Sequence, residues 1–294
     1  VTENLTFTGT LHGTVATTVA NTKTMTLAAT HFEDPLGNNQ KVIGGDGSTA
    51  VTGATATTRY DFRGITSDSG TTSVEFTTGG LINGFTRFSS ASTSLTIADG
   101  ETLRITADQA TGRTVESSGT GADDGDIYIT GLAAAVAYDF TGVASGSGTE
   151  KAEFSNSDVT LDSGASLGTV GLVITNANTA TISEAQADGR ATEGTGNLTV
   201  LAIATDTDLS NVASSGTVTA TVTASGDYSV NANISVVDIF EMTSAQNYTL
   251  TVAQALKAKI GAGGTLGTIT DGGTMTVVAS TGDNLTGITG ADAI

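Results

Sequence analysis

Apolar and polar residues alternate in short runs along most of this chain. The runs "NLTVLAI" (197–203), "TVTATVTA" (217–224) and "VDIFEMT" (237–243) are each bounded by Gly, Asn, Asp or Ser. This pattern predicts β-strands with one face buried, because successive side chains of a strand point to opposite faces. The runs start about 20 residues apart, which is typical of one turn of a β-solenoid with two or three strands and tight corners.

One segment has a helical character. The run "AQALKAKI" (253–260) has weaker counterparts in "DQATGR" (108–113) and "AQADGR" (185–190). Helices this short are marginal in isolation. We therefore expect single helical turns at corners between strands.

The sequence repeats itself at long range. A phrase read as "YDFRGIT" and "YDFTGVA" recurs with an apolar residue at its third position, and a glutamine recurs between its copies. The apolar positions are Phe62, Phe140, Leu209 and Leu285, and the glutamines are Gln109, Gln186 and Gln254, with Gln40 one unit earlier. Both series indicate a structural unit of about 73 residues. We interpret the phrase as a packing position that each unit fills with Phe or Leu.

Units of two lengths alternate, so a longer repeat of about 147 residues emerges. Phe7 corresponds to Phe154, and Met25 corresponds to Leu172. The chain is thus predicted to hold two super-repeats, residues 1–147 and 148–294, each made of two β units. We expect it to be a segment of, or one subunit in, a longer array.

Composition supports an all-β fold. Thr, Val and Ile favour pleated surfaces, and 38 glycines supply turns, while aromatic residues make up only 5% and Trp is absent. We predict a tandem-repeat β-solenoid. The alternative is a string of β-sandwich, immunoglobulin-like domains, although a unit of about 73 residues is short for a sandwich of about 100.

Charge excludes several classes of partner. The formal net charge of −19 repels phosphate backbones and anionic membranes, so we expect no nucleic-acid binding. No apolar stretch is long enough to span a bilayer, and no signal peptide is recognisable at the start of the sequence. Acidity also keeps a β-rich surface soluble.

Two stretches resemble a known group of proteins. "YTLTVAQALKAKIGAGGTLGTITDGG" (248–273) and "TDTDLSNVASSGTVTATVT" (205–223) are similar to the β-strand repeats of very large bacterial surface proteins, including surface-layer proteins and giant adhesins exported by type I secretion. The resemblance implies β-solenoids that assemble into lattices, sheaths or fibres, often with bound Ca²⁺. The tandem calcium-binding nonapeptide of such proteins is missing; "GGDGSTAVT" (44–52) has Thr49 where Asp is required.

Acidic residues offer one candidate metal site. The sequence "DDGD" places Asp123, Asp124 and Asp126 directly before an apolar run. Oxygen ligands suit Ca²⁺, so these carboxylates are a candidate calcium site, and a solvated turn is the other interpretation. Asp206 and Asp208 form a weaker second candidate.

Signals for catalysis are missing from the sequence. The chain has no Cys, no G-x-S-x-G motif and no P-loop, and His12 and His31 have no partner at metal-binding spacing. We expect no catalytic residues and no cofactor other than calcium.

The sequence thus favours a structural protein at a bacterial cell surface. Its expected partner is itself, in a lattice or filament. The alternative is a stalk or binding module of a large adhesin, for which surface glycans are candidate ligands. A polysaccharide-active β-helix enzyme would need carboxylates clustered with basic residues, and the 11 basic residues are scattered.

Overall fold

The computed structural model describes most of the chain. Residues 3–7, 16–33, 41–43, 46–66, 69–82, 84, 86–88, 93–119, 124–261, 263–268 and 273–290 are described. The chain divides into two compact units. Unit 1 comprises Val1–Leu132, Tyr138–Ala152 and Ser166–Val170, and unit 2 comprises Ala133–Ala137, Glu153–Ala165 and Gly171–Ile294.

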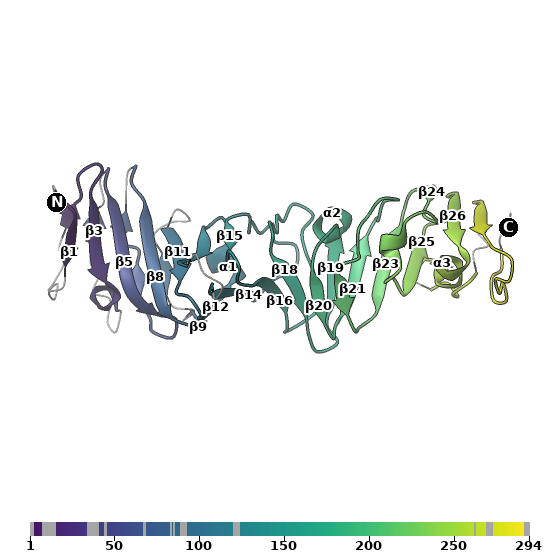
Figure 1. The fold of residues 1–294 in the computed structure, drawn as a ribbon, viewed down its shortest axis with the longest axis horizontal. Coiled ribbons are helices and arrows are strands. Elements are labelled where there is room, and N and C mark those ends of the chain that lie inside the picture. The colour runs from purple at the N-terminus through teal and green to yellow at the C-terminus, as the bar shows by residue number, and fades with distance from the viewer. Residues whose placement is uncertain are drawn as a thin grey trace. The chain divides into compact units, whose positions relative to one another are not determined.

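Both units are parallel β-solenoids, with about ten turns in the whole chain (Figure 1). Partner residues on adjacent turns lie between 18 residues apart, as Phe240 and Ala258 do, and 28 apart, as Val115 and Val143 do. The solenoid prediction is therefore confirmed. The β-sandwich alternative is wrong, because sandwiches are built from antiparallel sheets, whereas the ladders within each unit are parallel.

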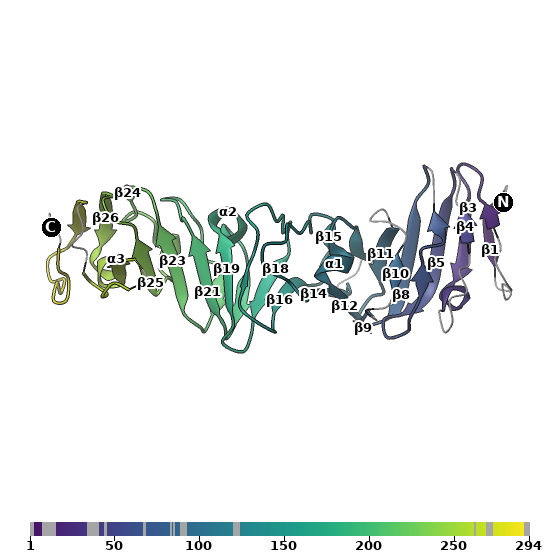
Figure 2. The same cartoon turned by 180° about the vertical axis from the view of Figure 1, so that it is seen from behind.

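Unit 1 is built on a long sheet ordered β1-β3-β5-β8-β11-β13-β15. Its strands are Leu5–Phe7, Thr24–Ala28, Ser48–Thr55, Thr72–Thr78, Thr93–Ile97, Val115–Ser117 and Val143–Ala144. Further strands are β2 (Ala16–Thr18), β4 (Lys41–Ile43), β6 (Asp61–Phe62), β7 (Ile65–Thr66), β9 (Gly80–Leu81), β10 (Arg87–Phe88), β12 (Thr102–Thr106) and β14 (Asp126–Thr130). Strands β4 and β10 are labelled in the view from behind (Figure 2). The helical turns are η1 (Ala29–Phe32) and α1 (Ala107–Ala110).

Strand β16 (Glu150–Phe154) contributes residues to both units, and the remaining strands belong to unit 2. Its main sheet is ordered β17-β19-β21-β23-β25-β27. These strands are Val159–Thr160, Thr179–Ser183, Asn197–Leu201, Val218–Val222, Ile239–Met242 and Ala258–Ile260. The others are β18 (Gly171–Ile174), β20 (Thr192–Gly194), β22 (Val212–Ser214), β24 (Gly226–Asp227), β26 (Tyr248–Thr251) and β28 (Met275–Val278).

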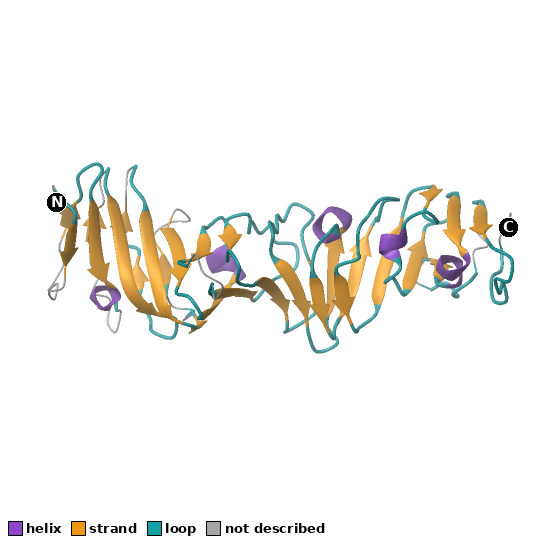
Figure 3. Ribbon diagram, in the orientation of Figure 1, coloured by secondary structure: helices purple, strands orange, loops and turns teal. Residues whose placement is uncertain are grey.

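Helices in unit 2 are single turns at corners: α2 (Glu184–Ala187), η2 (Ala232–Ile234) and α3 (Val252–Leu256) (Figure 3). The sequence prediction of one helical turn in each of the three glutamine segments is thus confirmed. No helix in the described part of the chain is long and apolar enough to cross a membrane.

The core of each unit is a set of stacked apolar columns. In unit 2, Ile182, Val200, Ala220, Phe240 and Ala258 occupy one register position on successive turns, and all are buried. Alternation along each strand produces this column, because inward residues of one turn lie directly over those of the next. Each Å² of apolar surface buried in this column contributes about 25 cal/mol to the stability of the fold. This burial helps to hold each turn against its neighbours.

Candidate functional site

The repeated phrase forms a corner of the solenoid. A carboxylate or amide oxygen at its second position accepts the backbone N–H two residues later: Asp61 from Arg63, Asp139 from Thr141, Asp208 from Ser210 and Asn284 from Thr286. This is an Asx-turn, which reverses the chain locally. The next residue points inward, and Phe62, Phe140 and Leu209 are completely buried, whereas Leu285 is only partly buried. The packing interpretation is confirmed for the first three.

The recurring glutamine lies within a helical turn and caps the start of that turn. Gln109, Gln186 and Gln254 occupy the third helical position behind a Thr or Ser cap. In each, Oε1 accepts the backbone N–H of the cap residue, at 3.3, 3.0 and 2.8 Å respectively. The arrangement is a capping box, which satisfies two N–H groups that the helix leaves open. Gln40 lies outside the described residues.

The same glutamine also links two turns of the solenoid. Nε2 of Gln186 donates to the carbonyl oxygens of Asp162 and Ala165 at 2.8 and 3.0 Å, and Nε2 of Gln254 donates to that of Tyr228 at 2.9 Å. These acceptors lie 21 to 26 residues earlier in the chain. Repetition of Gln therefore reflects a structural link between turns.

An arginine follows the glutamine by four residues in two of the glutamine segments; Arg113 is buried and Arg190 is partly buried. Arg113 donates from Nε to the carbonyl of Gln109 at 2.8 Å, and Arg190 donates in the same way to that of Gln186. Burial lowers the pKa of both guanidinium groups from their ordinary value, because the charged form loses contact with water. Arg113 also lies 4.7 Å over the ring of Phe88. Each arginine thus donates to a carbonyl oxygen of a one-turn helix. We interpret the role of both side chains as structural.

The candidate calcium residues are only partly within the described part of the chain. Asp123 lies outside it. Asp124 Oδ2 accepts the N–H of Ser147 at 2.7 Å, and Asp126 Oδ1 accepts that of Thr149 at 2.8 Å. Both carboxylates thus hold the backbone of the next turn. The calcium site stays a prediction.

Asp124 and Asp126 border an open recess of about 490 Å³. Asp99 and Glu101 of the preceding turn line it as well. Glu101 Oε2 accepts the N–H of Gly79 at 2.7 Å, so it too bonds to a neighbouring turn. Among the described residues, no group of three or more His, Asp or Glu side chains is arranged to hold a metal ion.

The other chemical candidates lie apart from one another. Asp208 forms its own Asx-turn, and the hydrogen bond from the Ser210 hydroxyl lowers the pKa of its carboxyl. Asp206 is exposed nearby. His31 lies 2.8 Å from the carbonyl oxygen of Ala28 and 5.6 Å from the Phe7 ring, while His12 is outside the described residues.

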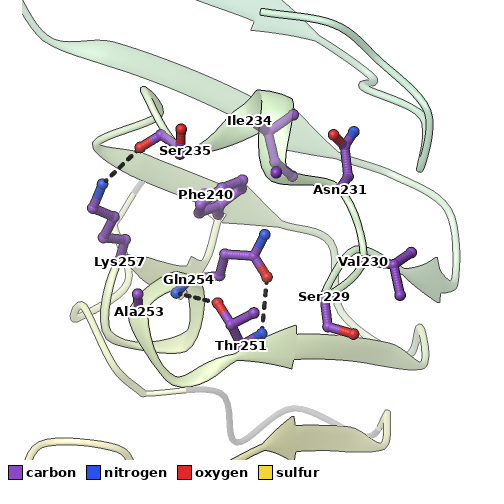
Figure 4. Close-up of a pocket in the computed structure, with 11 residues that line it drawn as sticks. Ser229, Val230, Asn231, Ile234, Ser235, Phe240, Thr251, Ala253, Gln254 and Lys257 are labelled. Carbon is purple, nitrogen blue, oxygen red and sulfur yellow. Dashed lines mark hydrogen bonds between the residues drawn. The ribbon is translucent and has the colours of Figure 1, made fainter. Parts of the chain in front are cut away.

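A pocket of about 410 Å³ opens in unit 2 between η2 and α3 (Figure 4). Phe240 and Gln254 lie at its centre, Ile234 at one side, and Val230 and Ser229 at the opposite rim. Its remaining lining residues are Asn231, Ala232, Ser235, Thr251, Ala253 and Lys257. The wall is mainly apolar, and its size falls within the range of small ligand sites.

Most polar side chains around this pocket already have partners. Asn231 Nδ2 donates to Thr207 O, Gln254 donates to Tyr228 O, and the Ser229 hydroxyl donates to Asp227. Lys257 Nζ donates to Val237 O at 2.6 Å and contacts Ser235 O at 3.4 Å. Lys257 is the only charged side chain among the described residues that line the pocket.

Sequence reasoning did not find this pocket. Lys257 follows the glutamine by three residues, where Arg113 and Arg190 follow theirs by four. This difference in spacing was the one feature of the sequence that could have pointed to the pocket. Comparisons with protein-family models, curated protein sequences and solved structures found no match for the chain.

Proposed function

We propose that the chain is a structural, self-assembling protein of a bacterial cell surface, where its repeats build a surface layer, sheath or fibre. The observation that supports this most is the use of side-chain polar groups to join turns. Gln186, Asp124 and Asp126 each bond to the backbone of a neighbouring turn. Repeats that contact only their neighbours gain stability as they are added, which suits an extended array.

Surface charge is consistent with an extracellular array. A net charge of −19 opposes non-specific aggregation of parallel strands while leaving specific contacts possible. The absence of Cys means that the stack is held without disulfides. The resemblance to surface-layer and adhesin repeats supports the same location. The proposed role is mechanical, with no catalytic step.

Electron microscopy of the purified chain at rising concentration tests this proposal. We expect ordered filaments or sheets with a constant repeat. Isolated rods at every concentration would refute self-assembly. Isolated rods that bind surface glycans in a glycan-microarray assay would support the alternative function, a stalk or binding module of a large adhesin.

Calcium is part of the proposal and has its own test. If Asp123, Asp124 and Asp126 hold Ca²⁺, the thermal midpoint should rise with millimolar Ca²⁺ and fall with chelator, by mass action on the folded state. Asp123→Asn should abolish this response, while Asp206→Asn should keep it. An unchanged midpoint in chelator would remove calcium from the proposal and leave self-assembly standing.

A further inference from the structure

We infer that the pocket between η2 and α3 binds an acidic segment of a second copy of this chain, with Lys257 receiving its carboxylate. This inference rests on the proposed self-assembly and names one of its contacts. The occupant is defined by two features of the pocket, a cation at its edge and an apolar wall.

The Lys257 ammonium group has one N–H donor that is available to a carboxylate. Its Nζ uses two of three protons on the carbonyl oxygens of Val237 and Ser235, both on the preceding turn. No carboxylate in the described part of the chain lies within ion-pair distance of it. By contrast, Lys259 two residues later is paired with Glu241 at 3.0 Å. The carbonyl contacts fix the ammonium at the pocket edge and leave its third donor available.

Lys257 lies at one edge of the pocket and the apolar Val230 at the other (Figure 4). Val230 is 78% exposed, the largest exposed fraction among the large hydrophobic residues described, and it forms the rim opposite α3 (Figure 4). Ile234 and Phe240 are buried and close the back of the pocket. An occupant that covers Val230 removes apolar area from water, which is worth about 25 cal/mol per Å². The occupant therefore carries an apolar side chain beside its carboxylate.

Charge favours a second copy as the source of that segment. The chain has 30 acidic residues against 11 basic ones, so a carboxylate is the charged group that a copy most often presents. One pair on the chain matches the full description. Leu5 is 45% exposed, and Glu3, also exposed, lies two residues away; no other large exposed apolar residue of the described part has a carboxylate that close.

A contact of this kind joins different surfaces of two copies. Such a heterologous contact does not close on itself unless its rotation generates a ring, and otherwise it continues into a filament. Eleven described residues line the pocket, whereas each partner of a stable complex contributes roughly 20–30 residues. The contact therefore contributes specificity and register within an array, where many weak contacts act together.

Zero-length cross-linking tests the contact directly. A carbodiimide joins an ammonium to a carboxylate only when the two are in contact, and a mixture of ¹⁴N- and ¹⁵N-labelled chains identifies links between copies by mass spectrometry. We expect mixed-isotope links from Lys257 to an acidic residue beside an apolar one, first of all Glu3. Links should increase with protein concentration in step with assembly.

Two matched variants separate the outcomes. Lys257→Met should raise the concentration needed for filaments several-fold, whereas Lys259→Met, the same change outside the pocket, should not. Circular dichroism establishes that both are folded. If the wild type assembles but Lys257 forms no links and Lys257→Met assembles normally, this inference is wrong and the proposed function stands. If the wild type does not assemble, both fail.

Discussion

At three corners of the solenoid a glutamine side chain bonds both within its own turn and to the turn before it. Gln186 accepts from its own cap residue and donates to two carbonyls of the turn before it. It is also 95% buried, since only 5% of its surface is exposed. Replacing it removes bonds that water cannot readily restore, because a buried polar group left unpaired keeps its desolvation cost.

Gln186→Met keeps the volume of this side chain and deletes its hydrogen bonds. We expect the free energy of unfolding to fall by about 1–3 kcal/mol, since carbonyls of Asp162 and Ala165 lose their donor. Chemical denaturation followed by circular dichroism measures the change. Gln246→Met is the control, because Gln246 is partly exposed and its side chain bonds, among the described residues, only to the Ser225 hydroxyl. Equal losses in the two variants would contradict the proposed link.

Asp61 makes stability depend on pH. Hydrogen bonding from the Arg63 side chain, with Nη2 2.6 Å from Oδ2, holds the pKa of this carboxyl below its usual range. A lowered folded pKa means that the stabilisation is complete above the unfolded value, about 3.9, and is lost as pH falls through the folded value. The thermal midpoint should therefore drop in that acidic window.

Asp61→Asn should lose on the order of 1 kcal/mol at neutral pH and show a flatter decline in the same acidic window. Thermal melts between pH 2 and pH 7 measure both effects. Asp139→Asn is the comparison for an Asx-turn without an ion pair. The Thr141 hydroxyl bond also lowers the pKa of Asp139, but this carboxyl is exposed, so a smaller change than in Asp61→Asn is expected. A wild-type profile that matches that of Asp61→Asn would exclude the ion pair as a source of acid sensitivity.

Among the strands, β20 ends at a glycine, Gly194, that is required by the close approach of the preceding turn. Gly194 has φ +116°, and a Cβ placed there would collide with the carbonyl oxygen of Ile174 on the preceding turn. Gly189 also has a positive φ, +65°, but has open space around it. Substitution of Gly189 therefore tests backbone strain alone, whereas substitution of Gly194 tests strain together with a steric collision.

Gly194→Ala should destabilise the chain by at least about 2 kcal/mol, because strain and collision add. Gly189→Ala should cost only about 1–2 kcal/mol, the price of a left-handed conformation for an alanine. Denaturant midpoints of both variants give the comparison. If Gly189→Ala proved the more damaging change, the close approach of β20 and β18 would not limit the sequence.

Strands and corners were the elements most open to prediction from sequence. Alternation predicted β21, β23 and β25, and the glutamine segments predicted helical turns at corners, because both depend on neighbours within a few residues. The Asx-turn at the repeated Asp was found only in the structure. The pocket could not be predicted. Lys257 reaches carbonyls of Ser235 and Val237, which are 22 and 20 residues away. Every residue has a backbone carbonyl, so the sequence does not indicate which carbonyls will accept a hydrogen bond from Lys257. Whether Lys257 reaches them depends on the exact number of residues in one turn.

The solenoid as a whole gains its stability turn by turn. Each turn places its apolar residues over those of the previous one, as Ile182, Val200 and Ala220 do. Net charge acts across all turns at once and in the opposite direction, because acidic surfaces of two copies repel each other. Assembly should therefore be controlled by the charge of the whole chain more than by any single contact.

Association should increase as pH falls from 7 toward the isoelectric point near 4.1, and as salt is added at pH 7. Salt at 0.1 M shortens the range of charge repulsion to about 10 Å. Contacts between uncharged surfaces of two copies can then form. Light scattering across pH and NaCl concentration measures the effect, and return to pH 7 in low salt should dissolve the particles. The ion pair at Lys257 is weakened by the same salt, so Lys257→Met should lose its disadvantage at high ionic strength. Particle size that ignores both pH and salt would contradict control by net charge.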